Sequence, residues 1–152
     1  MTISERLRDA TDKVYLRIRD PKAWQPETSQ AAGLESLRGH KNVLLHTFRK
    51  SGEAVPTPVW FGLADGKLYF RTYADAAKVK RIRANPRVLI GPCDMRGKPE
   101  GPVFEARARP LDANEESIAE QAIQSNFGVF RRIYLAGFSG RIPDTYVEVT
   151  PV

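Results

Sequence analysis

The chain has few of the residues from which disulfides, metal sites and nucleophilic centres are built. Its 152 residues include one cysteine, Cys93, and two histidines, His40 and His46. A single cysteine excludes an internal disulfide framework and is typical of a reducing compartment. Neither histidine has carboxylates or thiolates at a ligand spacing, so we expect no metal site. Cys93 is predicted to be a buried thiol at a strand end rather than a nucleophile.

Long apolar runs and nucleotide-binding motifs are also missing. No stretch approaches the ~18 apolar residues of a membrane-spanning helix. The first 20 residues are charged throughout and lack the apolar centre of a signal peptide. We therefore expect a cytoplasmic protein that makes no membrane contact. The absence of a Walker loop and of a G-x-G-x-x-G sequence argues against the usual P-loop and Rossmann nucleotide sites.

Positive charge is the main excess in the composition. Lysine and arginine total 24 against 18 aspartates and glutamates, which gives a formal net charge of +6. An excess of this size favours an anionic partner, such as a phosphorylated cofactor, an acidic lipid or a nucleic acid. No RNA-binding sheet motif is recognisable, so nucleic acid is the weaker expectation.

The pattern of turns and apolar residues predicts one mainly β domain of the α+β class. From Asn42 onward the apolar residues recur with period two, and glycine turns separate the runs. Six short antiparallel strands joined mostly by hairpins favour a small barrel over an open parallel sheet. We expect strands over 42–49, 54–63, 67–72, 87–92, 103–111 and 145–152, and helices over 4–19, 28–38, 75–84 and 114–134.

Two prolines mark the strand predicted at 54–63. Pro56 and Pro58 direct their nitrogens to the same side, and neither carries an amide hydrogen, so that side cannot donate ladder bonds. Such a strand must lie at a sheet edge, at a bulge, or against something other than a strand. The amides of Thr57 and Val59 are expected to remain available to a flat ligand. An ordinary edge strand whose prolines discourage aggregation is the alternative.

A short basic helix is predicted at 75–84, directly after a strand that ends with Arg71 and Thr72. Asp75 is a plausible N-cap, which places Lys78 in the first turn. Helix amides, the positive end of the helix dipole, Lys78 and Arg71 together would form a phosphate seat. The alternative is a solvated basic helix, because the Asp75 carboxylate would compete with a bound anion.

Several runs of the sequence resemble one known family. Residues 43–45 and the PTPVWF segment at 56–61 resemble the first two strands of the pyridoxamine 5′-phosphate oxidase-like, flavin-binding split barrel. Residues 68–72 and 78–88 resemble its cofactor-phosphate segment. Residues 91–102 (GPCDMRGKPEGP) are similar to the actinobacterial branch that uses the deazaflavin coenzyme F420. The resemblance covers about residues 35–152.

This resemblance implies a fold and a cofactor site. The fold is a six-stranded antiparallel split β-barrel with short flanking helices over residues 31–152, preceded by a helical extension over 1–30. Thr72 and Lys78 match positions that bind the cofactor phosphate, and Thr57 and Val59 match the strand beside the ring. The expected cofactor-binding set is Pro56, Thr57, Pro58, Val59, Arg71, Thr72 and Lys78.

The resemblance also implies an activity. Ala76 and Ala77 stand where the oxidase pattern has Ser-Arg, which favours F420, with its longer and more acidic tail, over FMN. We expect an F420-dependent oxidoreductase that transfers a hydride to an electron-poor small molecule, without a catalytic side chain. Members of the family are homodimers with cofactor sites shared between subunits. The alternatives are an FMN- or haem-binding split barrel, acting as oxidase or carrier, and a non-catalytic basic module that binds phosphorylated ligands or nucleic acid.

Overall fold

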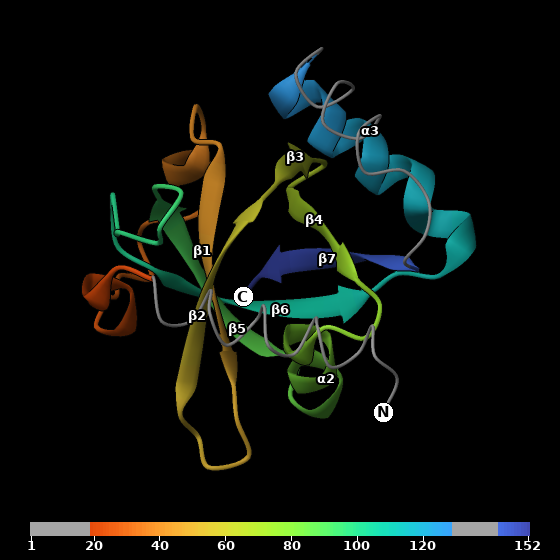
Figure 1. Cartoon of the computed structure of the whole chain (residues 1–152). Coiled ribbons are helices and arrows are strands. Elements are labelled where there is room, and N and C mark those ends of the chain that lie inside the picture. Colours follow the sequence, from red (N-terminus) through yellow and green to blue (C-terminus); the bar gives the residue numbers. More distant parts are fainter. Residues whose placement is uncertain (1–18, 129–142) are drawn as a thin grey trace.

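In this computed structural model, which describes residues 19–128 and 143–152, seven antiparallel strands form one strongly curved sheet (Figure 1). The order across the sheet is β2-β1-β5-β6-β7-β4-β3. The two edge strands, β2 and β3, therefore follow one another in the sequence, and the sheet curls into a half-barrel. The strands are β1 (Asn42–Phe48), β2 (Ala54–Trp60), β3 (Gly62–Ala64), β4 (Lys67–Tyr73), β5 (Arg87–Cys93), β6 (Phe104–Pro110) and β7 (Asp144–Pro151).

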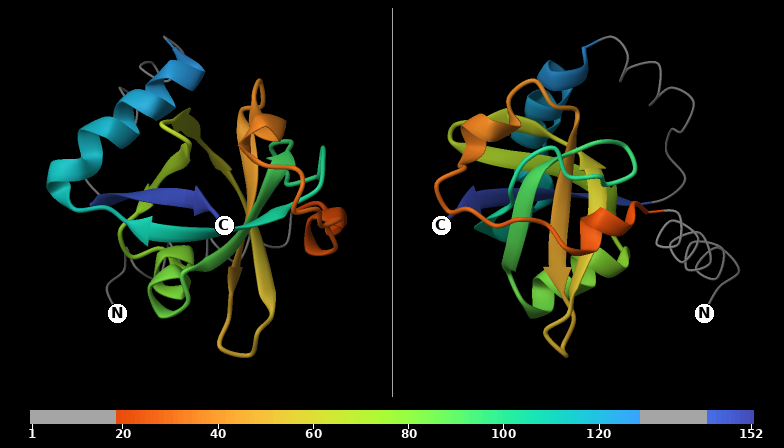
Figure 2. Two further views of the ribbon diagram at one scale, coloured as in Figure 1. Left: turned by 180° about the vertical axis from the view of Figure 1, so that it is seen from behind. Right: turned by 90° about the vertical axis from the view of Figure 1, so that its left-hand side faces the viewer.

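Two α-helices cover different parts of the sheet. Helix α2 (Ala77–Ala84) packs Ile82 into the end of the main apolar core. Helix α3 (Glu116–Phe127) lies across the outside of β3, β4 and β7 (Figure 2). The described residues also contain three 3₁₀ turns, η1 (Pro21–Trp24), η2 (Leu34–Leu37) and η3 (Ala113–Glu115).

Alternation along each strand separates an inner face of the sheet from an outer face. On β1, Val43 and Leu45 enter the main core, whereas Leu44 packs on the outside against Ala23 and Cys93. We call the side that faces the main core the inner face. Successive side chains of a strand point to opposite faces, and paired residues of neighbouring strands share a face. The ladder register therefore assigns all the remaining strand residues to the inner or the outer face.

Strand β2 lies at an edge of the sheet, as its prolines predict. Its ladder with β1 runs in unbroken register, with Pro56 opposite His46 and Pro58 opposite Leu44. Since prolines cannot donate, the ladder amides must be those of Thr57 and the residues that alternate with it. Arg19 accordingly donates to the Pro56 carbonyl from outside the sheet. The expectation that the Thr57 and Val59 amides stay available is therefore wrong, because they face β1.

The predicted fold class is confirmed, but the strand count differs by one. The segment expected as a single strand over 54–63 forms β2 and β3, with Phe61 between them. Phe61 is 1% exposed in the main core, so the chain bends there to bury the ring. The bend carries the chain from one edge of the sheet to the other, which no local pattern could show.

Three predicted helices differ from the structure. The region 28–38 contains only the turn η2, because Ser29 donates to Val103 in an extended segment and Gly33 has a φ of +24°. Helix α2 begins at Ala77 rather than at 75, with Ala76 as an N-cap that has no capping side chain, so the Asp75 cap is wrong. Helix α3 ends at Phe127. The helix predicted over 4–19 lies outside the described residues except for Arg19, which is in a bend, and the continuation of α3 past 128 lies outside them as well.

Candidate functional site

The first element of the site is a lysine held by a threonine. Lys78 lies in the first turn of α2, and its Nζ donates to Thr72 Oγ1 on β4 at 3.1 Å. Thr72 shares its face of β4 with Leu68 and Phe70, which are both in the main core, so it belongs to the inner face. The strand thus fixes a cation at the amino end of a helix, where an anion is also favoured by the helix dipole.

A second cation is held in the same way one turn later. The Nε of Arg81 donates to Thr47 Oγ1 on β1 at 2.6 Å. Thr47 lies on the inner face, since it alternates with Val43 and Leu45. In the sheet, three strands separate β1 from β4. Helix α2 therefore links two strands from distant parts of the curved sheet, because Lys78 is bound to β4 and Arg81 is bound to β1.

The inner face of β2 adds an uncharged wall to this region. Thr57 lies opposite Leu45, and Val59 lies opposite Val43 and packs against the main core, so both side chains are on the inner face. Strands β2 and β4, which are not neighbours in the ladder, also lie close to one another. The structure thus brings Thr57, Val59, Thr72 and Lys78 to one side of the sheet.

The other three predicted site residues lie elsewhere. The side chains of Pro56 and Pro58 are on the outer face, opposite His46 and Leu44. Arg71 is on the outer face of β4, where it forms an ion pair with Asp144 and lies 5.6 Å from the centre of the Tyr146 ring. Adjacent residues of a strand point to opposite faces, so the sequence already contained the signal that Arg71 and Thr72 are separated.

A basic groove, which was not predicted from the sequence, continues the site. It has a volume of about 500 Å³ and lies between the β1–β2 hairpin and the second half of α2. Arg81 lines the groove as well as binding Thr47, so the groove and the inner-face cations are contiguous. The lining residues are Phe48, Arg49, Lys50, Gly52, Lys80, Arg81, Ala84 and Asn85.

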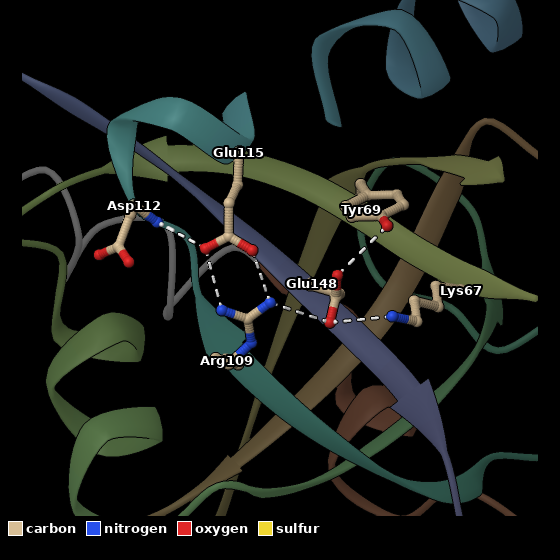
Figure 3. Close-up of polar contacts among 6 residues, drawn as sticks. All are labelled: Lys67, Tyr69, Arg109, Asp112, Glu115 and Glu148. Carbon is tan, nitrogen blue, oxygen red and sulfur yellow. Dashed lines mark hydrogen bonds and ion pairs between the residues drawn. The ribbon is translucent and has the colours of Figure 1, made fainter. Parts of the chain in front are cut away.

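A separate polar network lies on the outer face (Figure 3). Glu148 on β7 accepts from the Tyr69 hydroxyl at 3.2 Å and pairs with Lys67 and Arg109 at 3.5 and 3.4 Å. Arg109 in turn binds both carboxylate oxygens of Glu115. Burial, and next the charge of Glu148, raise the pKa of Tyr69. The network ties β4, β6, β7 and η3 together and is separated from α2 by the sheet.

We expect this network to stabilise the fold without affecting ligand binding. Glu148→Ala leaves Tyr69 and two cations without their shared carboxylate, which should lower the free energy of unfolding by about 1–2 kcal/mol. The control is Glu105→Ala, which removes only the exposed pair with Arg87 and should cost less than about 0.5 kcal/mol. Urea unfolding of both variants measures this. Equal losses in the two variants would contradict the prediction.

The remaining candidates from the sequence do not form a reactive centre. Cys93 is the last residue of β5 and is 2% exposed, and burial raises the pKa of its thiol to about 12, so the prediction of a buried strand-end thiol is confirmed. His40 lies 3.6 Å from Glu100. Within residues 19–128 and 143–152, no three histidine, cysteine or acidic side chains gather as a metal site. No helix in these same ranges has the length and apolar character needed to cross a membrane.

Comparison with known proteins decides the family. A family model described as Pyridoxamine 5′-phosphate oxidase matches residues 30–151, which is most of the chain. The chain belongs to this family. Membership in the pyridoxamine 5′-phosphate oxidase family agrees with the curved sheet and with the edge strand β2, and it confirms the resemblance seen in the sequence. No curated protein sequence matches the chain significantly.

Solved structures with the same fold bind different groups. The haem storage protein HutZ of Vibrio cholerae aligns with a TM-score of 0.59 at 18% identity, covering 78% of this chain and 86% of its own. An FAD-binding protein of Mesorhizobium loti aligns with a TM-score of 0.56 at 18% identity, covering 77% and 83%. A structure named as an F420 reductase aligns with a TM-score of 0.50 at 18% identity, covering 79% and 93%. At these identities the likeness shows the fold of the pyridoxamine 5′-phosphate oxidase family and not the ligand.

Proposed function

We propose that this protein is an F420-dependent oxidoreductase that reduces an electron-poor small molecule. The observation that carries the proposal is the row of cations along α2. Lys78, bound to Thr72, offers a place for a phosphate, and Arg81 continues the row into a basic groove. A single phosphate would need only the first of these positions. A cofactor with a phosphate followed by a carboxylate-bearing tail would use the whole row.

The donor set of the site fits the anionic end of such a cofactor. A lysine and an arginine, each positioned by a threonine hydroxyl, supply charge and hydrogen bonds for oxygen anions. Thr57 adds a hydroxyl and Val59 an apolar surface on the inner face of β2, where a planar ring would lie. The F420-reductase and FAD-binding structures with this fold support a ring of the flavin class.

In the proposed mechanism the protein binds and orients and does not transfer protons. When bound, reduced deazaflavin supplies a hydride in a two-electron step. Six groups whose pKa values are clearly shifted, His46, Tyr69, Arg71, Cys93, Arg109 and Glu115, lie outside the inner face. The four predicted site residues that share the inner face, Thr57, Val59, Thr72 and Lys78, include no carboxylate, histidine or thiol. We therefore assign catalysis to proximity and to exclusion of water, with Lys78 and Thr72 fixing the anionic end. We further propose that a second copy of the chain contributes to the site, as the resemblance to homodimeric split barrels implies.

Titration with two cofactors tests the proposal. Purified protein is titrated with F420 and, separately, with FMN, and binding is followed by quenching of cofactor fluorescence. We expect saturable binding of F420 that is at least tenfold tighter than that of FMN. Binding of FMN alone would replace the proposal with an FMN-dependent enzyme, in line with the FAD-binding relative in fold. Binding of neither would favour a non-catalytic basic module.

Charge reversal in the groove separates the two cofactors further. The double variant Lys50→Glu/Lys80→Glu places carboxylates on both sides of the groove. Because F420 has an acidic tail and FMN does not, we expect the Kd for F420 to rise about tenfold, equivalent to about 1.4 kcal/mol, and the Kd for FMN to change less than twofold. The effect should shrink in 0.5 M salt as screening increases.

The matched control has the same net charge at a different place. Lys22→Glu/Lys98→Glu alters two exposed lysines on η1 and on the loop after β5, neither of which lines the groove. We expect less than a twofold change for either cofactor. An equal loss of F420 affinity in both double variants would show that overall charge, and not the groove, attracts the tail.

A further inference from the structure

His46 is buried on the outer face of β1 with one ring nitrogen unsatisfied. The side chain is 1% exposed. Its Nε2 lies 2.8 Å from the carbonyl oxygen of Ala23 in η1. Because a carbonyl can only accept, Nε2 carries a proton in this contact. The other nitrogen, Nδ1, is buried without a hydrogen-bond partner among the described residues.

Within residues 19–128 and 143–152, the cross-strand neighbours of this ring are uncharged. Its cross-strand neighbours are Pro56 on β2 and Leu89 on β5, and η1 covers it with Ala23. Strand β2 contains no charged residue. The described elements packed around it carry Arg19, Asp20 and Lys22 at η1, Arg87 and Cys93 on β5, and Asp94, Arg96, Lys98 and Glu100 on the loop that follows. Burial is the main cause that lowers the pKa of His46, and it outweighs the hydrogen bond to the Ala23 carbonyl, which acts in the opposite direction.

The segment that His46 holds also contacts β2. Arg19 donates to the Pro56 carbonyl on the open edge of that strand, and the Asp20 amide donates to the Arg96 carbonyl at 2.9 Å. Residues 19–24 are therefore fastened at Pro56, at His46 and at the loop after β5. Thr57 and Val59 come after Pro56 on β2, but their side chains lie on the inner face, where they form the wall of the proposed ring site.

We propose that His46 is a pH-dependent positioning residue: neutral His46 clamps residues 19–24 against the outer side of β2, and protonation releases them and loosens the strand that carries the ring site. The effect on the cofactor rests on the proposed function. The release of residues 19–24 does not, and it can be measured without any ligand.

The physical reason is the cost of a second ring proton. Protonated His46 would place an N–H at Nδ1 with no acceptor and a charge in an apolar layer, both of which are unfavourable. Strand β1 cannot yield easily, because it pairs with β2 on one side and with β5 on the other. The turn η1 is only four residues long and is the weaker element. Its displacement would expose the ring to water and relieve the cost.

The sign of the pH dependence follows from the lowered pKa. The ordinary pKa of histidine is about 6.5, and in the folded protein that of His46 lies below it. The clamp is therefore fully formed above about pH 6.5. It weakens as the pH falls below that value, because protons then bind more tightly to the released state than to the clamped state.

Trp24 provides a direct reporter of the clamp. It lies in η1 and is 38% exposed, and the chain has only one other tryptophan, Trp60. In a Trp60→Phe background, acrylamide quenching of Trp24 is measured from pH 8 to pH 5. We expect the quenching constant to rise at least twofold, with a midpoint below about pH 6.5. No rise over this range, with the sheet still folded by circular dichroism, would overturn the proposal.

The matched control removes the titration but keeps a donor. His46→Gln in the same background places an amide N–H within reach of the Ala23 carbonyl and has no charge at any of these pH values. We expect flat quenching in this variant, and a rise equal to that of the parent would overturn the proposal. A second measurement needs no substitution at His46. The ¹⁵N shifts of its ring should report a protonated Nε2 and a bare Nδ1 at pH 7.5, and a protonated Nδ1 at that pH would refute the assignment.

Cofactor titration over the same pH range tests the link to the ring site. We expect the Kd for F420 to rise about fivefold more between pH 7.5 and pH 5.5 in the parent than in His46→Gln, a comparison that cancels titration of the ligand itself. Equal rises would overturn the coupling between the clamp and the site. Absence of cofactor binding at pH 7.5 would instead refute the proposed function, and the Trp24 and ¹⁵N measurements would still decide the clamp.

Discussion

Replacing Lys78 by alanine is expected to weaken cofactor binding about 10- to 100-fold. Its Nζ is already fixed by Thr72 Oγ1 at 3.1 Å, so the side chain is positioned before the ligand arrives. A hydrogen bond from a charged group contributes about 1.5–3 kcal/mol, which corresponds to this range of affinities. The measurement is fluorescence titration with F420 and with FMN. Both cofactors should lose affinity, because both have a phosphate.

The control for Lys78 lies on the same helix. Arg83→Ala removes an equal charge from an exposed position that does not line the groove, and we expect less than a twofold change in Kd. Neither variant should unfold the protein, since α2 is held by the buried Val79 and Ile82. If Lys78→Ala binds both cofactors as tightly as the parent does, the phosphate position assigned to α2 is wrong.

Gly62→Ala is expected to have the largest effect on stability. A Cβ at this position of β3 would lie 2.1 Å from the carbonyl oxygen of Ala122 and 2.4 Å from the amide nitrogen of Ile123. Both are backbone atoms of α3, so neither can rotate away, and either the helix or the strand must move. Overpacking of this kind costs about 3 kcal/mol, and the expected result is a loss of that size in the free energy of unfolding, measured with urea.

A second glycine separates steric overlap from backbone strain. Gly52, in the β1–β2 hairpin, has a φ of +90°, and a Cβ there would meet no atom within 4 Å. Gly52→Ala should therefore show only the cost of the left-handed conformation, about 1 kcal/mol. If Gly62→Ala costs no more than Gly52→Ala, the close packing of α3 on β3 is not a constraint on the fold.

Local chemistry was enough to predict the edge strand and the turns. Pro56 and Pro58 lack amide hydrogens, and β2 lies at the edge that this requires. Asp65 and Gly66 predicted a tight hairpin, and they connect β3 to β4 with φ values of +53° and +73°. Each of these features depends on residues that are neighbours in the chain, which is why one sequence suffices to recognise them.

Predictions made from neighbouring residues were wrong where a residue bonds to a distant segment of the chain. The apolar spacing over 28–38 is helical, but Ser29 bonds to Val103 and the chain stays extended there. Likewise, the closeness of Arg71 and Lys78 in the sequence predicts that both belong to one site. On the folded sheet Arg71 points to the outer face and pairs with Asp144, which comes from a strand more than 70 residues later.

The sequence alone determined the fold class, the edge strand and the presence of a cation early in α2, because turn residues, prolines and alternation act over a few residues. Only the tertiary structure decided that Thr47 and Thr72 hold two cations of one helix, although three strands separate β1 from β4. It also decided that a groove joins the β1–β2 hairpin to α2. Both depend on how far the sheet curls, which is set by burial of the common core and not by any single segment.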